Sequence, residues 1–446
     1  MKTPGNTRGK SVLSFVLLAA AAVPFLFPVP EVRAGNPHGA IYSSVTNRVF
    51  WFVLASDSHV GKKNGKGPEN LQWLLGEAKD TIDPSFIVLT GDLTDSTDGG
   101  LYPDGPYLSE WTEYRNIVDG AGATASFFFD IPGNHDAYND GTLSFFRNHA
   151  IQGRATGGTQ CSWKRDFAFG SYHFLGMCTV GNDGASFSLI PPEYGDHAGL
   201  DEGELTFIEN ALEANREADL TLAFGHHPLV RPAFTLETWD DTALTYGLDA
   251  FTGLMDGYGV SLYGYGHTHV YDEQFFVRNM TEGVIYLNTA AVGEISNNAY
   301  ALAAIDCNGI SVRSLEVKSW PLVLITAPLD PNLGVALNPY TWKVPRVGTG
   351  NPVRALVFDK NPILSVEYRI DEAGSWLPMQ AVPGNPHLWE ADAPVDLSGQ
   401  THIVEVRATG SSTGWDRIPT GEPPAPVEDD KKGCFIETIA AGTRTP

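Results

Sequence analysis

One pattern repeats between residues 49 and 313: a short, continuously apolar run ends abruptly in polar residues. Runs of this kind are typical of strands that are buried on both faces. Apolar residues at helical spacing lie between them, within 71–78, 111–118 and 201–218. The pattern therefore predicts an α/β sheet whose functional side chains follow the C-terminal ends of its strands. The predicted strands are Val49–Ala55, Phe86–Leu89, Phe127–Phe129, Leu220–Phe224 and Val260–Tyr263.

Two local features refine this first region. Asp201 and Glu204 form a capping-box-like start to the helix predicted over 201–218. The stretch 137–199 reads as an insert of hairpin and loop, which we expect to lie over the functional site. A turn at Gly170-Ser171 would place Cys178 opposite Trp163 and only diagonal to Cys161. A disulfide between these cysteines would need a bulge or a slipped register, so we do not expect one.

The pattern changes after Trp320, where helical periodicity stops and short alternating segments begin. Turn residues separate these segments, which predicts a β-sandwich over residues 320–410. From Ser411 the chain becomes polar, proline-rich and then charged, so we expect residues 411–446 to be a disordered tail. The predicted sandwich strands are 322–326, 353–358, 364–370, 376–379, 387–391 and 402–408.

The N-terminus has the features of a cleavable signal peptide over residues 1–34. Basic residues precede an apolar stretch over 12–27, and Val32-Arg33-Ala34 forms a small-x-small cleavage pattern. The alternative is an uncleaved anchor, but prolines interrupt the apolar stretch. We therefore expect a mature chain that is secreted, periplasmic or at the cell surface and has no transmembrane span.

Charge narrows the range of partners. The 446 residues carry 29 basic and 53 acidic side chains, a formal net charge of −24. A field of this sign repels phosphate backbones, which argues against DNA or RNA binding as the main function. The oligomeric state is left open.

Each predicted strand is followed by a cluster of polar residues that could bind a metal ion. Carboxylates, imidazoles and one amide oxygen form a donor set suited to zinc, manganese or iron. Any one cluster arises by chance in many chains, whereas five in order, each closing an apolar run, point to a shared site. Histidines 149, 173 and 197 lack this setting and are expected to be structural, and His227 to be structural or supporting. The clusters are Asp57-Ser58-His59, Gly91-Asp92-Leu93-Thr94-Asp95, Gly133-Asn134-His135-Asp136, Gly225-His226-His227-Pro228 and Gly266-His267-Thr268-His269.

This constellation resembles the calcineurin-like metallophosphoesterase family over about residues 48–313, which implies a four-layer α/β/β/α sandwich. Residue by residue, the resemblance makes Asp57, His59 and His269 ligands of a first metal ion and Asp92 the carboxylate that bridges two. Asn134, His226 and His267 become ligands of the second ion. His135 matches the histidine that assists the leaving group, and Asp95 the carboxylate that orients it.

The resemblance implies an enzyme that uses two divalent ions (iron, manganese or zinc). It would hydrolyse small phosphate mono- or diesters by attack of a metal-bridging hydroxide. Tyr138, Asn139 and Arg231 follow ligand motifs and are candidate substrate contacts. The alternative is a secreted binding or adhesion protein in which the metal domain is structural. An unliganded histidine at position 135 favours the enzyme, since a structural site would not need one.

Two features of the C-terminal half remain. The segment 319–326, with the upstream domain, is similar to relatives of transmembrane protein 62, in which an immunoglobulin-like sandwich follows the phosphoesterase. The sandwich would be a structural brace or a binding module, and we favour the brace. Gly433-Cys434-Phe435-Ile436 resembles a Cys-Phe-Ile box at the C-termini of some exported bacterial proteins. It would be a sorting signal or an incidental part of a frayed tail.

Overall fold

The structure, a computed structural model, describes most of the chain. The described residues are 48–100, 103–180, 198–229, 244, 246–279, 282–333, 336–337, 351–372, 374–397 and 401–420. The predicted signal peptide, His197, Arg231 and the Cys-Phe-Ile box lie outside them. Among the described residues, no helix is both long enough and apolar enough to cross a membrane.

The first sheet has the strand order β11-β10-β1-β2-β3. β1, β2 and β3 run parallel, whereas β10 and β11 join the sheet antiparallel. The three parallel strands match the first three predicted runs to within two residues, because each is buried on both faces. The bounds are β1 Val49–Ala55, β2 Ile87–Thr90, β3 Phe128–Ile131, β10 Ala299–Asp306 and β11 Gly309–Glu316.

The second sheet has the order β4-β5-β6-β7-β9-β8. Its middle strands β5, β6, β7 and β9 are parallel, and β4 and β8 close the two edges antiparallel. The predicted runs at 220–224 and 260–263 are β6 and β7. The bounds are β4 Cys161–Phe167, β5 Gly170–Gly176, β6 Leu220–Phe224, β7 Val260–Tyr265, β8 Asp272–Asn279 and β9 Glu282–Asn288.

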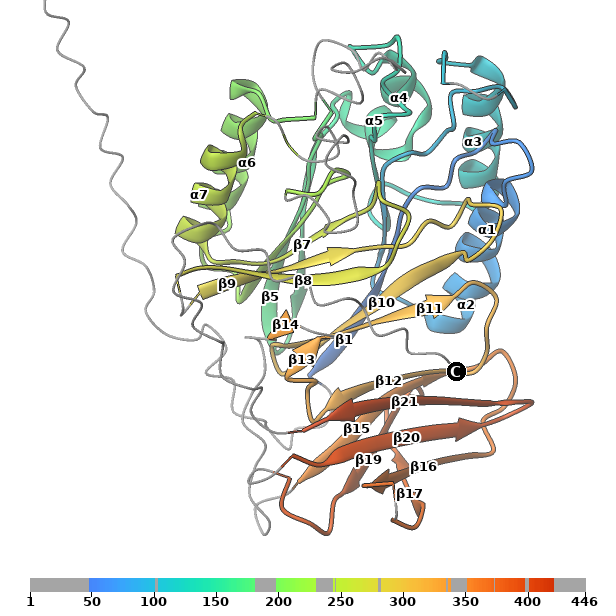
Figure 1. Ribbon diagram of the computed structural model, residues 1–446, viewed down its shortest axis with the longest axis vertical. Coiled ribbons are helices and arrows are strands. Elements are labelled where there is room, and N and C mark those ends of the chain that lie inside the picture. Colours follow the sequence, from blue (N-terminus) through green and yellow to red (C-terminus); the bar gives the residue numbers. More distant parts are fainter. Residues whose placement is uncertain are drawn as a thin grey trace, which may run out of the picture.

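The two sheets face each other and helices cover both outer faces, so the layers are α/β/β/α (Figure 1). Aromatic rings fill the space between the sheets, among them Phe52 stacked on Phe86 and Phe129 stacked on Trp163. Helices α1 to α5 cover the first sheet, and α6 and α7 the second. The bounds are α1 Gly67–Trp73, η1 Leu74–Ala78 (one π-helical turn), α2 Lys79–Ile82, α3 Leu108–Gly120, α4 Ser144–His149, α5 Ile151–Thr156, α6 Glu202–Ala214 and α7 Leu248–Tyr258.

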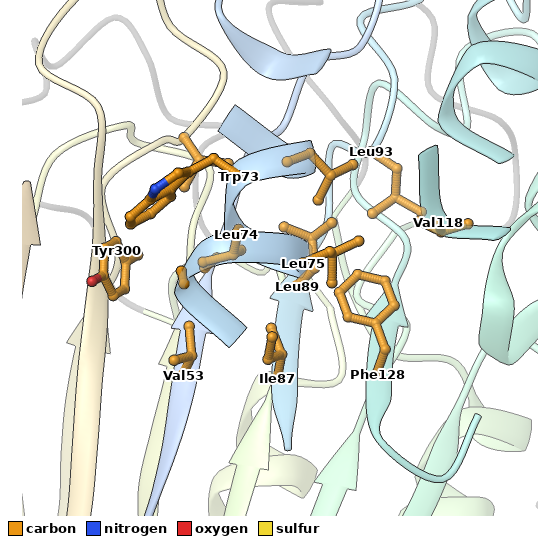
Figure 2. Packing of buried hydrophobic residues seen from close by; sticks show 14 of the residues in the cluster. Val53, Trp73, Leu74, Leu75, Ile87, Leu89, Leu93, Val118, Phe128 and Tyr300 are labelled. Atoms are coloured by element: carbon orange, nitrogen blue, oxygen red, sulfur yellow. The ribbon is translucent and has the colours of Figure 1, made fainter. Parts of the chain in front are cut away.

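The apolar face predicted for residues 71–78 packs as expected. Leu74 and Leu75 point from the helical segment onto Val53, Ile87 and Leu89 of the first sheet (Figure 2). The capping box that opens α6 is also present, because the Asp201 carboxylate accepts from the Glu204 N–H and the Glu204 carboxylate accepts from the Asp201 N–H.

The hairpin prediction was wrong in two respects. The turn lies at residues 168–169, two residues earlier than predicted, so Trp163 faces Phe174 and Cys161 faces Gly176. The hairpin is also no insert over the site, since it forms the β4–β5 edge of the second sheet. Its ring-bearing residues pack between the sheets, and this burial sets the register. Cys161 and Cys178 are free thiols, as predicted.

The C-terminal part is a pair of facing antiparallel sheets, with the orders β12-β15-β19-β18 and β17-β16-β20-β21. Its immunoglobulin-like type stays a prediction. β21 contradicts the disorder expected from Ser411, because residues 413–419 pair along the whole of β20. The bounds are β12 Leu322–Ala327, β15 Pro352–Phe358, β16 Ser365–Ile370, β17 Leu377–Pro378, β18 Gln380–Ala381, β19 Leu388–Asp392, β20 Ile403–Thr409 and β21 Thr413–Pro419, with a further short pair β13 Asn332–Leu333 and β14 Ala336–Leu337.

The two halves share one apolar core. Leu322, Leu324 and Phe358 belong to the same buried cluster as Tyr300 and Leu302 of the first sheet. A buried ion pair crosses the same boundary, with Arg354 Nε of β15 3.3 Å from Asp306 Oδ2 at the end of β10. The sandwich therefore packs on the α/β region as a continuous body below it (Figure 1).

Candidate metal centre

Seven predicted metal ligands meet where the strands of both sheets end. Asp57 and His59 follow β1, Asp92 follows β2 and Asn134 follows β3, whereas His226 follows β6 and the pair His267 and His269 follows β7. The C-terminal ends of parallel strands lie at one edge of a sheet, and the two facing sheets bring their edges together. The structure thus collects residues that are up to 212 positions apart in the chain, from Asp57 to His269.

The first ligand set is Asp57, His59, Asp92 and His269, each of which has one donor atom within 4.8 Å of the others. The Nε2 atoms of His59 and His269 are 3.0 Å apart. Asp57 Oδ1 lies 3.3 Å from Nε2 of His269 and 3.8 Å from Nε2 of His59. This oxygen is buried and faces the ring nitrogens of both histidines. Lone pairs that converge in this way fit a cation.

The second ligand set is Asn134, His226 and His267. Asn134 Oδ1 lies 2.8 Å from His226 Nε2 and 3.0 Å from His267 Nδ1. The Asn134 amide donates from Nδ2 to the Tyr138 hydroxyl at 3.0 Å, which turns its oxygen toward the histidines. Tyr138, a candidate substrate contact from the sequence, therefore supports a ligand.

Asp92, the predicted bridging carboxylate, lies between the two sets. Its Oδ2 is 3.3 Å from His226 Nε2 in the second set and 3.8 Å from His59 Nε2 in the first. Its other oxygen, Oδ1, accepts a hydrogen bond from the backbone N–H of His135 at 2.9 Å. One oxygen is held by the backbone while the other faces both ligand sets.

His135 lies beside the two sets, with Nε2 4.0 Å from Asp92 Oδ2 and part of its side chain exposed. The role predicted for Asp95 was wrong in its detail. The Asp95 carboxylate lies 3.0 Å from Nδ1 of His59, a predicted ligand, and not against His135. It is the backbone carbonyl of Asp95 that contacts His135 Nδ1, at 2.6 Å. Asp95 therefore orients both histidines, one through its side chain and one through its backbone.

Glu294 was missed by the sequence analysis. It follows β9 and lies 3.0 Å from Nδ1 of His269. The same carboxylate forms an ion pair with Lys62, in the loop after His59. Carboxylates in this position fix the ring orientation of ligand histidines and raise their basicity. No motif marks Glu294 in the sequence, because its partner lies 25 positions away on another strand end.

The pKa values of the site residues reflect a balance between burial and the charges of neighbouring side chains. Burial lowers the pKa of His226 and His269, but the charges and hydrogen bonds of Asp92 and Asp57 outweigh it and raise them to about 9 and about 10. Burial likewise opposes the ionised form of Asp57, yet the charge and hydrogen bond of His269 bring its pKa down to about 2. The carboxylates hold positive charge at the site, and a divalent ion would compete with these protons for the same nitrogens.

The backbone of the site is unusual. Asp57, His59, Asp92, His267 and His269 all have positive φ angles, between 41° and 70°. Non-glycine residues seldom adopt this region, and such outliers gather at functional sites.

Gly91 is needed for close approach. A Cβ there would lie 2.4 Å from Nδ1 of His226. That nitrogen already contacts the Thr90 carbonyl oxygen at 2.7 Å.

The remaining described histidines divide as follows. His227 is buried and its Nδ1 lies 3.0 Å from the Thr179 hydroxyl, while its ring packs on that of His267. It belongs to a group of three histidine donors with His226 and His267, next to the second ligand set. His173 contacts Ser162 within the β4–β5 hairpin, and His149 stacks on Phe145, so both are structural as predicted. Asn139, a candidate substrate contact from the sequence, donates hydrogen bonds from its side-chain amide to the backbone carbonyls of residues 104 and 105.

A model of the calcineurin-like phosphoesterase family matches residues 50–271. The chain carries a calcineurin-like phosphoesterase domain. Mouse (Mus musculus) transmembrane protein 62 is 26% identical over 94% of this chain and 64% of its own length, so the similarity continues into the sandwich. An Arabidopsis thaliana protein named "putative metallophosphoesterase" is 24% identical over 72% of this chain and 48% of its own. The chain thus spans less than two thirds of either relative.

Among solved structures, "GAP50 the anchor in the inner membrane complex of Plasmodium" shows a distant similarity to this chain. It has 13% sequence identity and a TM-score of 0.39, over 61% of this chain and 86% of that one. The family assignment rests on the family model and the two curated relatives, and the ligand positions named above fall within or next to the matched residues.

Proposed function

We propose that this protein hydrolyses phosphate mono- or diesters with two divalent metal ions, bound by the two ligand sets that share Asp92. The observation that carries the proposal is the combination of these sets with a neighbouring histidine, His135, that belongs to neither. Iron, manganese and zinc suit the nitrogen and oxygen donors. When bound, two such ions supply an activated water and neutralise charge on the phosphoryl group.

The protein's own contribution to the reaction is the proton that His135 holds. A backbone carbonyl only accepts hydrogen bonds, so the contact with the Asp95 oxygen places a proton on His135 Nδ1. When the ring also binds a proton on Nε2, the atom that lies on the side of Asp92, this N–H is the one that faces the site. From there it can donate to the departing oxygen of an ester.

The experiment compares esters that differ in their need for this proton. General acid assistance is worth about 10²–10⁴-fold when the leaving oxygen is strongly basic. His135→Ala should therefore nearly abolish hydrolysis of alkyl phosphate esters and reduce hydrolysis of nitrophenyl esters much less, with the metal content unchanged. Asp92→Asn, in contrast, should lower both metal content and rate, because both ligand sets lose their shared carboxylate.

Two results would overturn the proposal. Tightly bound metal with no turnover on any ester would favour the alternative, a binding or adhesion protein with a structural metal domain. Equal losses on both ester types in His135→Ala would remove the proton from the mechanism.

We also propose that the protein is exported after cleavage of residues 1–34 and that the sandwich braces the phosphoesterase domain. The shared core and the Arg354–Asp306 pair support a brace. N-terminal sequencing of the mature protein checks the first proposal, since it should begin at or near Gly35. An intact Met1 would indicate an anchor instead.

A further inference from the structure

Glu110 is a buried carboxylate outside the predicted site. It lies in the first turn of α3, with 2% of its surface exposed. It accepts hydrogen bonds from three consecutive backbone N–H groups, those of Ser96, Thr97 and Asp98, at 2.7, 3.1 and 2.7 Å. Such charge-assisted bonds are about twice as strong as neutral ones. One side chain thus fixes a whole turn of the loop that follows β2.

This loop is the one that orients the site histidines. Asp95 is the first residue of this loop, which spans 95–98. It contacts His59 through its carboxylate and His135 through its carbonyl oxygen. The Ser96 hydroxyl donates to the backbone carbonyl of His135 at 2.5 Å. Any rotation of the peptide units at 95–97 would therefore move the hydrogen-bond partners of His135 on both its ring and its backbone.

The backbone of this loop is strained, so contacts from outside the loop must stabilise its conformation. Ser96 and Asp98 have φ angles of 55° and 45°, a region in which non-glycine residues are strained. Gly61 lies against the carboxyl group of Glu110, and a Cβ at this glycine would be 2.3 Å from Glu110 Oε1. The carboxylate is therefore enclosed between α3, the loop and the turn after His59.

Burying this carboxylate is costly for the fold. Desolvation raises the pKa of Glu110 to about 7, even though the three backbone donors pull it down. Strongly perturbed pKa values cluster at functional sites, and Glu110 holds a loop that borders the candidate site.

We infer that Glu110 is a positioning residue of the phosphoesterase reaction, which holds the 95–98 loop so that the Asp95 carbonyl keeps the His135 ring aimed at the leaving oxygen. The inference rests on the proposed function. It assigns Glu110 no contact with substrate or metal. Its effect passes through hydrogen bonds to the loop.

The test uses Glu110→Gln, with Glu113→Gln as matched control, because Glu113 is exposed on the same helix. An amide cannot accept from all three N–H groups, since its NH₂ would face a donor. A misplacement of about 1 Å costs up to about 10²-fold in rate. We expect Glu110→Gln to lose about 10- to 100-fold in kcat on alkyl phosphate esters, and less than about threefold on nitrophenyl esters. The metal content should be unchanged, and the control should behave as wild type.

A readout independent of turnover is the Nδ1 proton of His135, observed by NMR in selectively ¹⁵N-histidine-labelled protein. It should be protected from exchange in the wild type and in Glu113→Gln, and exchange faster in Glu110→Gln. If Glu110→Gln does not fold, Glu110→Asp keeps the charge but shortens the reach and should show the same pattern. Equal rate losses on both ester types, or an unchanged Nδ1 signal in the variant, would overturn the inference. Inactivity of the wild type on every ester would refute the proposed function alone, and the NMR comparison would still decide the role of Glu110.

Discussion

The buried ion pair between the two halves of the molecule allows a quantitative test of the proposal that the sandwich stabilises the phosphoesterase domain. Arg354 Nε and Asp306 Oδ2 lie 3.3 Å apart and neither side chain has any exposed surface. At an effective dielectric constant of about 20, two charges at this separation attract by about 5 kcal/mol. Burial nevertheless raises the pKa of Asp306 against the pull of Arg354, so desolvation cancels most of this attraction. Breaking the pair should cost more than the pair contributes.

Asp306→Asn removes only the charge, because the amide oxygen can still accept from the Thr326 hydroxyl, which lies 2.8 Å from Asp306 Oδ2. The buried guanidinium group would lose this counter-charge, and removing one partner of a buried ion pair typically costs about 3–5 kcal/mol. The assay is urea unfolding followed by tryptophan fluorescence and circular dichroism. Both probes should report one shifted transition, since the sandwich shares its core with the phosphoesterase domain.

The controls separate charge burial from general disruption. Asp306→Asn with Arg354→Met removes both charges and should recover most of the loss, because apolar replacements of buried pairs are often neutral. Asp80→Asn breaks the exposed pair with Lys79 and should cost less than about 1 kcal/mol. A loss below about 1 kcal/mol in Asp306→Asn, or a sandwich that unfolds in its own transition, would refute the reasoning.

Two further perturbations test the site and the cap of α6. Glu294→Gln should weaken metal binding by about 10- to 100-fold, because His269 loses its carboxylate partner. Competition with a chelator measures this affinity. The control variant Glu316→Gln, at an exposed position, should bind metal as the wild type does. Burial, with the nearby Asp201 charge, raises the pKa of Glu204 to about 7. The folded state then holds an extra proton between about pH 4.5 and 7, so stability should fall as pH rises through this window. Glu204→Gln should make that slope shallower in urea unfolding at pH 5 and 8, because Glu110 still contributes to it. Glu202→Gln in the same turn should leave the slope unchanged. A wild-type stability that rises over this window would contradict the assignment.

The sequence predicts the strands well, and it also predicts that the candidate ligands follow the strand ends, because both features depend on local patterns. β1 and β6 occupy the predicted residues, since a strand buried on both faces must be apolar throughout. Turn position in the β4–β5 hairpin could not be predicted in the same way. Its register depends on which rings enter the space between the sheets, and that space is built by strands distant in the chain.

The supporting carboxylates were harder still to predict. Glu110 and Glu294 resemble any other acidic residue in an acidic chain, and their roles arise from partners on other elements. For Asp95, the sequence could not predict which histidine its carboxylate contacts. Its motif was recognised, but the choice between His59 and His135 depends on the path of the loop, which Glu110 fixes from α3.

The left-handed backbone of the proposed ligand residues also limits how the proposed metal centre could be redesigned. Asp57, Asp92 and His267 each meet two demands at once, a donor atom and a positive φ. Aspartate, asparagine and histidine are enriched several-fold among non-glycine residues in that region, and β-branched or bulky residues are outliers there. Exchanging these ligands for glutamate or cysteine to change metal preference would therefore alter the backbone as well as the donor. If the proposed ligands bind metal, its selectivity should be easier to alter through the residues that contact them, such as Glu294, than through the ligands themselves.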